Sequence, residues 1–202
     1  MATISPQQSR DVCAYVTTHG ADYLEAPVLG SIPEALDGSL IIMAGGDARV
    51  YARVEPVLKV LGTDIRLIGA VGAGAALRLA MNQLIAALTA GFTLSLAFAQ
   101  RNQVDVDTFM DTVRASALYA KTYDKKLQKY LDRSFAGTNF STKHLLKDVR
   151  LFIQDAQQLG LETSAGPTTI TTLHKGQVFG EVVLVDEGLR SIPGGSLIPL
   201  GM

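Results

Sequence analysis

Helix-like and strand-like hydrophobic patterns alternate over roughly the first third of the chain. Ser5 followed by Pro6 is typical of a helix start, because a serine side chain caps the first turn and proline has no N–H to leave unpaired. We expect this helix to run to about His19 and to end at the following glycine. Residues 22–26 predict a short strand, and residues 29–36, which contain glycine, serine and proline, predict a loop.

Two further strands are predicted on either side of a second helix. The apolar, partly β-branched residues 39–44 predict one strand, and residues 65–68 predict the other. Asp47 can cap the intervening helix, whose apolar positions recur with helical spacing. These positions are expected to share one buried face: Val50, Val54, Val57, Leu58 and Leu61. Three strands are fewer than the roughly six of a doubly wound dinucleotide-binding domain, so we expect only the C-terminal part of such a domain.

Beyond Gly69 the pattern becomes helical throughout. Residues 72–101 predict a long apolar helix, and Asp105 or Asp107 is expected to start the next helix, which runs to about residue 115. Further helices are predicted at 119–133, 141–159 and 167–175. The pattern therefore predicts three regions: a partial Rossmann-like α/β domain at 1–70, an all-helical domain at 71–175 and an irregular tail at 176–202.

The long apolar helix admits a second interpretation. Residues 79–100 carry no charge, and such a stretch is long enough to cross a bilayer. Arg78 and Arg101 flank both ends, so no orientation bias is visible. Several polar or small residues interrupt the stretch: Asn82, Gln83, Thr89, Gly91, Thr93, Ser95 and Gln100. We interpret it as a helix buried on nearly all sides of an all-helical domain, with a small membrane protein as an alternative.

Composition narrows the possible functions. The 202 residues are 48% hydrophobic and 18% charged, which is sufficient for a sizeable core. A net charge of −1 gives no electrostatic reason to expect nucleic acid or an anionic membrane as a partner. Cys13 is the single cysteine and the N-terminus does not read as a signal peptide, so a cytoplasmic location is expected. The three histidines show no ligand spacing, and no metal site is predicted.

A glycine cluster lies between the last predicted strand and the long helix. Gly69, Gly72 and Gly74 have the spacing G-x-x-G-x-G, whereas the dinucleotide fingerprint is G-x-G-x-x-G. No following strand ends in an acidic residue. We therefore favour a structural role, in which small residues let the helix start lie close to a neighbouring backbone, over a phosphate-binding loop.

The same cluster continues into a motif that identifies a family. Gly69-x-x-Gly72-x-Gly74-x-x-x-Arg78-x-x-x-Asn82 resembles the junction between the nucleotide and helical domains of the β-hydroxyacid dehydrogenases. These include 3-hydroxyisobutyrate dehydrogenases, glyoxylate/succinic semialdehyde reductases and enzymes similar to 6-phosphogluconate dehydrogenase. The resemblance implies catalytic roles for Arg78, at the position of the family's lysine acid/base, and for Asn82. Their spacing places both on one helix face.

Other motifs follow in the family's order, over roughly residues 1–165. Thr3 corresponds to a threonine near the cofactor, and Lys147 to a lysine that reaches the cofactor and the substrate, so the resemblance implies binding of NAD or NADP. Residues 25–31 resemble a segment whose Ser-Gly-Gly holds the substrate carboxylate. The corresponding positions here are Leu29, Gly30 and Ser31. The implied substrate is a small hydroxy acid or aldehyde acid. Residues 38–46 resemble the strand that follows.

Departures from the family pattern weaken the implied chemistry. Arginine stays protonated, so Arg78 is a poor substitute for a lysine that passes a proton. Leu29 lacks the hydroxyl that the family uses, and the N-terminal half with the dinucleotide fingerprint is not in the chain. We therefore expect little or no dehydrogenase activity. Each residue also has a structural interpretation: an ion pair for Arg78, a satisfied polar contact for Asn82 and a solvated helix face for Lys147.

Two principal hypotheses remain beside the membrane alternative. The chain is either an NAD(P)-dependent oxidoreductase, impaired by truncation and by Arg78, or a non-enzymatic remnant that serves as an oligomerisation or binding module. The helical domain favours a homo-oligomer, because such domains in the family pack against a partner subunit. Strands without their usual neighbours would leave bare edges, so self-association is also expected.

Overall fold

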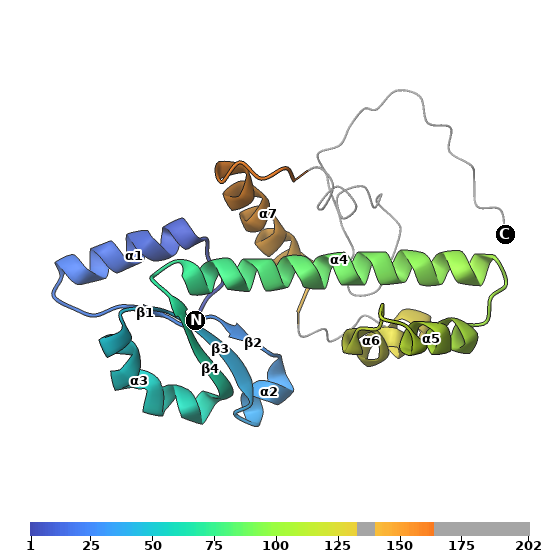
Figure 1. The fold of residues 1–202 in the computed structure, drawn as a ribbon, viewed down its shortest axis with the longest axis horizontal. Helices are drawn as coiled ribbons and strands as arrows, with labels where there is room; N and C mark the ends of the chain where they lie inside the picture. Colours follow the sequence, from blue (N-terminus) through green and yellow to red (C-terminus); the bar gives the residue numbers. More distant parts are fainter. Residues whose placement is uncertain (133–139, 164–202) are drawn as a thin grey trace.

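The computed structural model describes residues 1–132 and 140–163 of the chain. Figure 1 shows a small α/β region at one end of the molecule and a helical region at the other. The long helix α4 (Ala73–Arg101) leads from the first region through the second. The predicted fold class, a Rossmann-like part followed by helices, is confirmed. The helix predicted at 167–175 and the tail at 176–202 lie outside the described residues.

The sheet has four strands, not the three expected. The central strand β3 (Leu40–Gly46) pairs in parallel with β4 (Gly62–Gly69). Its other edge pairs antiparallel with β1 (Leu24–Glu25) and β2 (Val28–Leu29), which bind opposite ends of β3. The Met43 N–H donates to the Pro27 carbonyl between them, at 2.9 Å. Residues 24–29 thus follow one edge of β3 as two short strands, which are separated by Ala26 and the buried Pro27.

Helices α1 and α3 lie on opposite sides of the sheet (Figure 1). α1 (Pro6–Thr18) begins with a capping box between Ser5 and Gln8. α3 (Ala48–Leu61) begins at Asp47, whose side chain accepts a hydrogen bond from the Arg49 N–H. Both predicted helix starts are confirmed.

The expected buried face of α3 was partly wrong. Leu58 is buried, but Val57 is 64% exposed and Leu61 is 38% exposed. Val54 packs with Leu58 against the sheet as expected, and Tyr51, which was not expected there, joins them. The apolar residues of α3 span more of the helix circumference than the sheet can cover. Their spacing alone therefore could not predict which of them are buried.

The loop predicted at 29–36 was also wrong. Val28–Leu29 forms β2, and residues Ile32–Leu36 form the short helix α2. Glu34 supplies a capping box by accepting from the backbone N–H and the hydroxyl of Ser31. Pro33 lies in the first turn, where a missing N–H costs nothing. Local capping therefore stabilises a helix in a segment whose composition is typical of a loop.

Three further helices pack against α4. α7 (Thr142–Gln158), capped by Ser141, places Leu145 and Val149 against Ala86 and Ala90 of α4.

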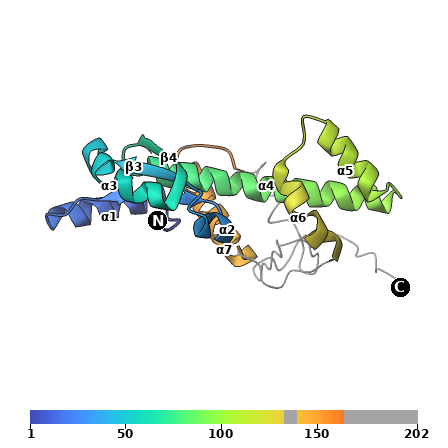
Figure 2. The same ribbon diagram turned by 90° about the horizontal axis from the view of Figure 1, so that it is seen from below.

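α5 (Val106–Ala115) is capped by Asp105, which settles the choice between two predicted starts. α6 (Lys121–Asp132) and α5 surround Phe92 of α4, whose ring stacks on that of Tyr123 at 4.4 Å. Figure 2 shows α5 and α6 beside the distal half of α4, away from the sheet.

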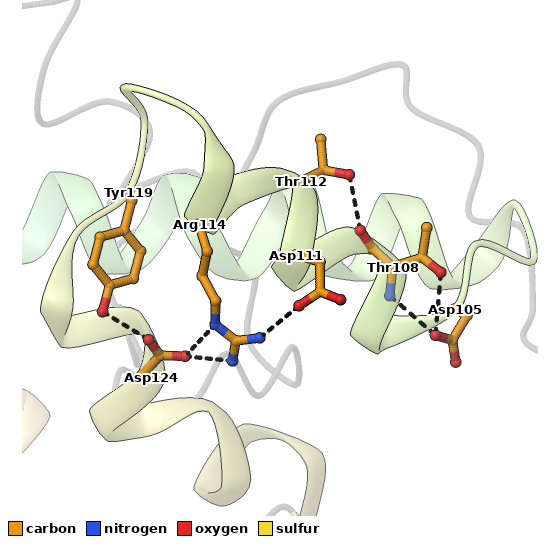
Figure 3. Close-up of polar contacts among 7 residues, drawn as sticks. All are labelled: Asp105, Thr108, Asp111, Thr112, Arg114, Tyr119 and Asp124. Carbon is orange, nitrogen blue, oxygen red and sulfur yellow. Dashed lines mark hydrogen bonds and ion pairs between the residues drawn. The ribbon is translucent and has the colours of Figure 1, made fainter.

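A cluster of ion pairs and hydrogen bonds fixes α6 relative to α5 (Figure 3). The Arg114 guanidinium donates to Oδ1 of Asp124 at 2.6 and 3.1 Å, and to Oδ1 of Asp111 at 3.0 Å. The Tyr119 hydroxyl donates to the second oxygen of Asp124 at 2.7 Å. The Arg114 guanidinium, followed by the Tyr119 hydroxyl, lowers the pKa of the Asp124 carboxyl. These contacts orient the first turns of α6, which contribute to the cavity described below.

By length and composition alone, α4 could also cross a membrane. Its most apolar window is 44% buried within the protein. The expectation that this helix is buried on nearly all sides was wrong. Its packing against α7, β3, α5 and α6 covers part of the helix, but four large apolar residues remain exposed: Leu84, Leu88, Leu94 and Phe98.

Candidate functional site

A buried carboxylate holds the N-terminus of α4. Oε1 of Glu25, on β1, accepts hydrogen bonds from the N–H groups of Gly72, Gly74 and Ala75 at 2.8, 2.7 and 3.3 Å. The Ser9 hydroxyl donates to its other oxygen. These N–H groups are the ones that a phosphate would use at a helix N-terminus. The glycine cluster therefore binds an internal carboxylate, which supports the structural interpretation.

Close backbone packing is the second reason for the glycines. A Cβ atom at Gly74 would collide with the Met43 carbonyl oxygen of β3. Gly72, immediately before α4, has a φ of 101°, which favours glycine. The start of α4 is consequently held directly against the sheet, and the residues one and two turns later have a fixed position.

Those later turns border a cavity of about 720 Å³. It lies between the turn after β2, the helix α4 and the helix α6. Five of the seven predicted site residues line it: Leu29, Gly30, Ser31, Arg78 and Asn82. The predicted same-face placement of Arg78 and Asn82 is what brings both to this cavity. α6 adds Lys125, Lys126 and Lys129, and α2 adds Glu34.

Asn82 presents a hydrogen-bond acceptor without a partner. The side chain is fully buried, and its Nδ2 donates to Oδ2 of Asp148 at 2.6 Å. A carboxylate only accepts, so the amide nitrogen must face Asp148, and the orientation of the amide is fixed. Oδ1 of Asn82 has no hydrogen-bond partner among the described residues. A buried acceptor of this kind is suited to a hydroxyl or another donor of a ligand.

Arg78 presents the complementary donor. Its NH1 nitrogen is buried and also has no hydrogen-bond partner among the described residues. Burial lowers the pKa of the guanidinium, and the negative charge of Asp148 acts in the opposite direction. A half-buried guanidinium whose buried NH1 has an unused N–H can bind a carboxylate or polarise a carbonyl oxygen. Arg78 and Asn82 together therefore offer a donor and an acceptor to one small molecule.

The two predicted cofactor residues contact each other. The Lys147 ammonium donates to the Thr3 carbonyl oxygen at 2.8 Å and pairs with Oδ1 of Asp148 at 2.8 Å. The Lys147 side chain is 49% exposed, whereas Asp148 is 2% exposed. Asp148 thus connects Lys147 to Asn82. Lys147 is therefore more than part of a solvated helix face, although its role toward a cofactor remains a prediction.

Sequence reasoning missed three residues of this site. Asp148 directly follows Lys147 in the sequence, but only Lys147 was given a role. Glu34 could have been found from the Ser-x-x-Glu spacing of a capping box. Lys125 lies 91 residues beyond Glu34, and its Nζ approaches Oε1 of Glu34 at 3.2 Å. No local pattern indicates that contact.

The turn at Gly30 and Ser31 already holds a carboxylate. Oε2 of Glu34 accepts from the Ser31 N–H at 2.8 Å and from the Ser31 hydroxyl at 2.6 Å. These two hydrogen bonds, more than the contact with Lys125, lower the pKa of Glu34 to about 2. The carboxylate is therefore ionised at any ordinary pH. Gly30 has a φ of 143°, which favours glycine at the turn.

Comparison with known proteins gives consistent matches along the chain. Residues 1–72 match the model of the NAD binding domain of 6-phosphogluconate dehydrogenase. Residues 72–177, more than half of the chain, match the NAD-binding domain model of NADP-dependent 3-hydroxyisobutyrate dehydrogenase.

Individual relatives agree with these models. An Arabidopsis thaliana glyoxylate/succinic semialdehyde reductase is 31% identical over 81% of this chain and 45% of its own length. The 2-hydroxy-3-oxopropionate reductase of Escherichia coli is 32% identical over 85% of this chain and 57% of its own. A Mycobacterium tuberculosis 3-hydroxyisobutyrate dehydrogenase structure, with L-serine, has a TM-score of 0.75 at 25% identity. It covers 83% of this chain and 60% of the other. The chain spans about half the length of the curated relatives it matches.

Proposed function

Because the chain belongs to the β-hydroxyacid dehydrogenase family, we propose that it binds a small hydroxy acid, or the corresponding oxo acid, and acts on it with NAD or NADP. One observation carries the proposal. The buried NH1 of Arg78 and the buried Oδ1 of Asn82 both lack partners among the described residues, and both residues line one cavity. A hydroxy acid supplies an acceptor for the first and a donor for the second.

The proposed roles follow from the chemistry of the side chains. Arg78 donates a hydrogen bond to the substrate oxygen that carries negative charge and polarises it. The side-chain oxygen of Asn82 accepts a hydrogen bond from the substrate hydroxyl. The nicotinamide supplies hydride transfer when bound. Because a guanidinium gives up its proton poorly, we propose that Arg78 positions the substrate well but transfers the proton slowly. The reaction is then impaired at that step.

The fit to a dinucleotide is partial. Thr3 and Lys147, joined by a hydrogen bond, offer polar groups for the nicotinamide side. The N–H groups at the start of α4 are already bonded to Glu25. We therefore propose that the phosphates of NAD or NADP are bound by residues other than the glycine cluster.

Arg78→Lys tests the proposal directly. A lysine in the same place can exchange a proton, because burial lowers its pKa toward neutrality. We expect turnover of NADPH with glyoxylate or succinic semialdehyde to rise at least tenfold over that of the unmodified chain. Arg101→Lys, at the far end of α4, serves as the matched control and should change nothing. Equal rates for Arg78→Lys and the unmodified chain would refute the assigned role of Arg78.

A second candidate function, self-association, is supported by a separate observation. Four large apolar residues of α4 are between 37% and 70% exposed: Leu84, Leu88, Leu94 and Phe98. At 100° per residue they lie within about a third of the helix circumference. The small residues Gly91 and Ser95 lie among them, which allows close helix packing. We propose a second copy of the chain as the partner of this stripe.

The mass in solution distinguishes this candidate. Light scattering on a sizing column should give a dimer for the unmodified chain and a monomer for Phe98→Glu. Leu118→Glu, an equally exposed apolar position outside the stripe, is the control and should remain dimeric. A monomeric unmodified chain would remove the oligomerisation candidate and leave the enzymatic one unaffected.

A further inference from the structure

We propose that a second crevice, at the carboxyl ends of β3 and β4, binds the phosphate group of a small molecule through three arginines: Arg10, Arg49 and Arg53. The crevice has a volume of about 830 Å³. It shares no lining residue with the cavity that contains Arg78 and Asn82. The inference therefore goes beyond the proposed function and does not depend on it.

The fold places this crevice where α/β sheets commonly bind ligands. Gly46, the last residue of β3, and Ala70, directly after the parallel strand β4, both line it. Helices α1 and α3, which lie on opposite sides of the sheet (Figure 1), contribute its other walls. In open α/β sheets, ligands bind in the crevice outside the carboxyl ends of the strands. The family's dinucleotide fingerprint belongs to the half that is not in the chain, so this crevice is a separate site.

The charged side chains of the crevice leave one positive charge in excess. Its lining carries three arginines and two aspartates, Asp22 and Asp47. Arg49 pairs with Asp47 at 3.2 Å, and Arg53 pairs with Asp22 at 2.6 Å. Arg10 has no ion pair among the described residues, and its guanidinium donates only to a glutamine of its own helix. The excess charge therefore resides on Arg10.

Each of the three guanidinium groups keeps a donor nitrogen for a ligand. Among the described residues, NH1 of Arg10, of Arg49 and of Arg53 has no hydrogen-bond acceptor. A Cβ atom at Gly72 would lie 2.6 Å from NH1 of Arg10, so this glycine leaves room for the guanidinium beside residues 70–71 of the crevice. The side chains of Arg49 and Arg53 are 91% and 63% exposed. A ligand can therefore reach them without any opening of the fold.

The arrangement favours a phosphate over a carboxylate. A guanidinium donates through a planar fork, which matches two oxygens of either anion. One fork thus satisfies both oxygens of a carboxylate. A tetrahedral phosphate has further oxygens that point in other directions and can accept from a second guanidinium. Arg10 comes from α1, whereas Arg49 and Arg53 come from α3 on the other side of the sheet.

Titration of the chain with inorganic pyrophosphate, followed by NMR of the backbone amides, tests the proposal. We expect saturable shifts centred on the amides of residues 46–50 and 70–71. Arg10→Gln and Arg53→Gln should each weaken binding about threefold, because each removes one charged donor at an exposed site. Arg66→Gln is the matched control and should bind like the unmodified chain. Arg66 pairs with Asp64 at 2.7 Å and is 67% exposed, much like Arg53, but it does not line the crevice.

Asp22→Asn should have the opposite effect. Asp22 pairs with Arg53, and after Asp47 it also contributes to the raised pKa of the Arg49 guanidinium. Its replacement removes a negative charge beside two arginines, so pyrophosphate should bind about threefold more tightly. Unchanged or weaker binding by Asp22→Asn would contradict the proposal, because the arginines would then not act through their charge.

Two further ligands identify the source of the phosphate. Tighter binding of AMP than of inorganic phosphate would support the site with an organic phosphate ester as its ligand. Equal affinities would support it with a free inorganic anion, and adenosine should not bind in either case. Absence of saturable shifts, or an equal loss for Arg66→Gln and Arg53→Gln, would overturn the phosphate site. The function proposed for the other cavity would then be unaffected.

Discussion

The two ends of α4 are held in opposite ways. Its first turn is anchored by buried polar groups, since the carboxylate of Glu25 accepts from three backbone N–H groups and from Ser9. Its distal half is held by an apolar cluster in which Phe92 stacks on Tyr123. Polar contacts in that distal region, such as Arg114 with Asp124, lie at the surface.

The polar contacts fix the position of the helix start, whereas the apolar contacts hold the distal half without fixing its position as closely. Hydrogen bonds to a buried carboxylate are directional, and an unmade one is costly, so they fix the helix start closely. Apolar packing depends mainly on the area removed from water and permits adjustment. The cavity lies between the two regions, with Arg78 and Asn82 on the precisely fixed part and Lys125 on the other.

Glu25→Ala should have the largest effect. It leaves three backbone N–H groups buried without an acceptor, so we expect the free energy of unfolding to fall by about 4 kcal/mol. Urea denaturation measures the fall, and hydrogen exchange should show that the amides of 72–75 lose protection first. Glu25→Gln, which keeps an acceptor, should lose less. A fall as small as that of the surface variant Glu55→Ala would show that the buried carboxylate does not anchor α4.

Phe92→Ala should rank second. Removal of a buried ring that contacts the aromatic residues of α5 and α6 is expected to cost about 3 kcal/mol. Hydrogen exchange should increase in α5 and α6 and remain low in β3 and β4. Equal loss of protection in the sheet would mean that the two regions unfold as one unit, which would contradict the contrast. Leu118→Ala, at an exposed apolar position outside the stripe on α4, is the control.

Asp124→Asn should have the smallest effect, and it should depend on pH. The folded-state pKa of Asp124 is lowered, mainly by Arg114. The unfolded-state pKa of an aspartate is about 4, and above this pH the ionised pair contributes its full stability. This contribution is lost as the pH falls through the lower folded-state pKa. The difference in urea midpoint between the variant and the unmodified chain should be present at pH 7 and shrink on acidification. A difference that is independent of pH would show that charge is not the cause. Asp132→Asn is the control on the same helix.

Local chemistry made much of the fold predictable. Ser5, Asp47 and Ser141 cap the helices that they were expected to start, because a capping bond forms within four residues. The same logic was available for Ser31 and Glu34, but glycine and proline around them are more typical of a loop. In the site, the spacing of four placed Arg78 and Asn82 correctly. Asp148 is 66 residues from Asn82, and only the folded chain brings them together.

The chain of contacts from Lys147 through Asp148 to Asn82 has a thermodynamic consequence. A nucleotide that draws the Lys147 ammonium away from Asp148 removes positive charge from that carboxylate, which then attracts the Asn82 amide more strongly. If the chain binds the two ligands as proposed, the acceptor of Asn82 is thereby held more rigidly toward the hydroxy acid. Linkage then requires the converse: the hydroxy acid must change the affinity for the nucleotide by the same factor. The two affinities thus share one coupling constant, which a titration of either ligand in the presence of the other measures.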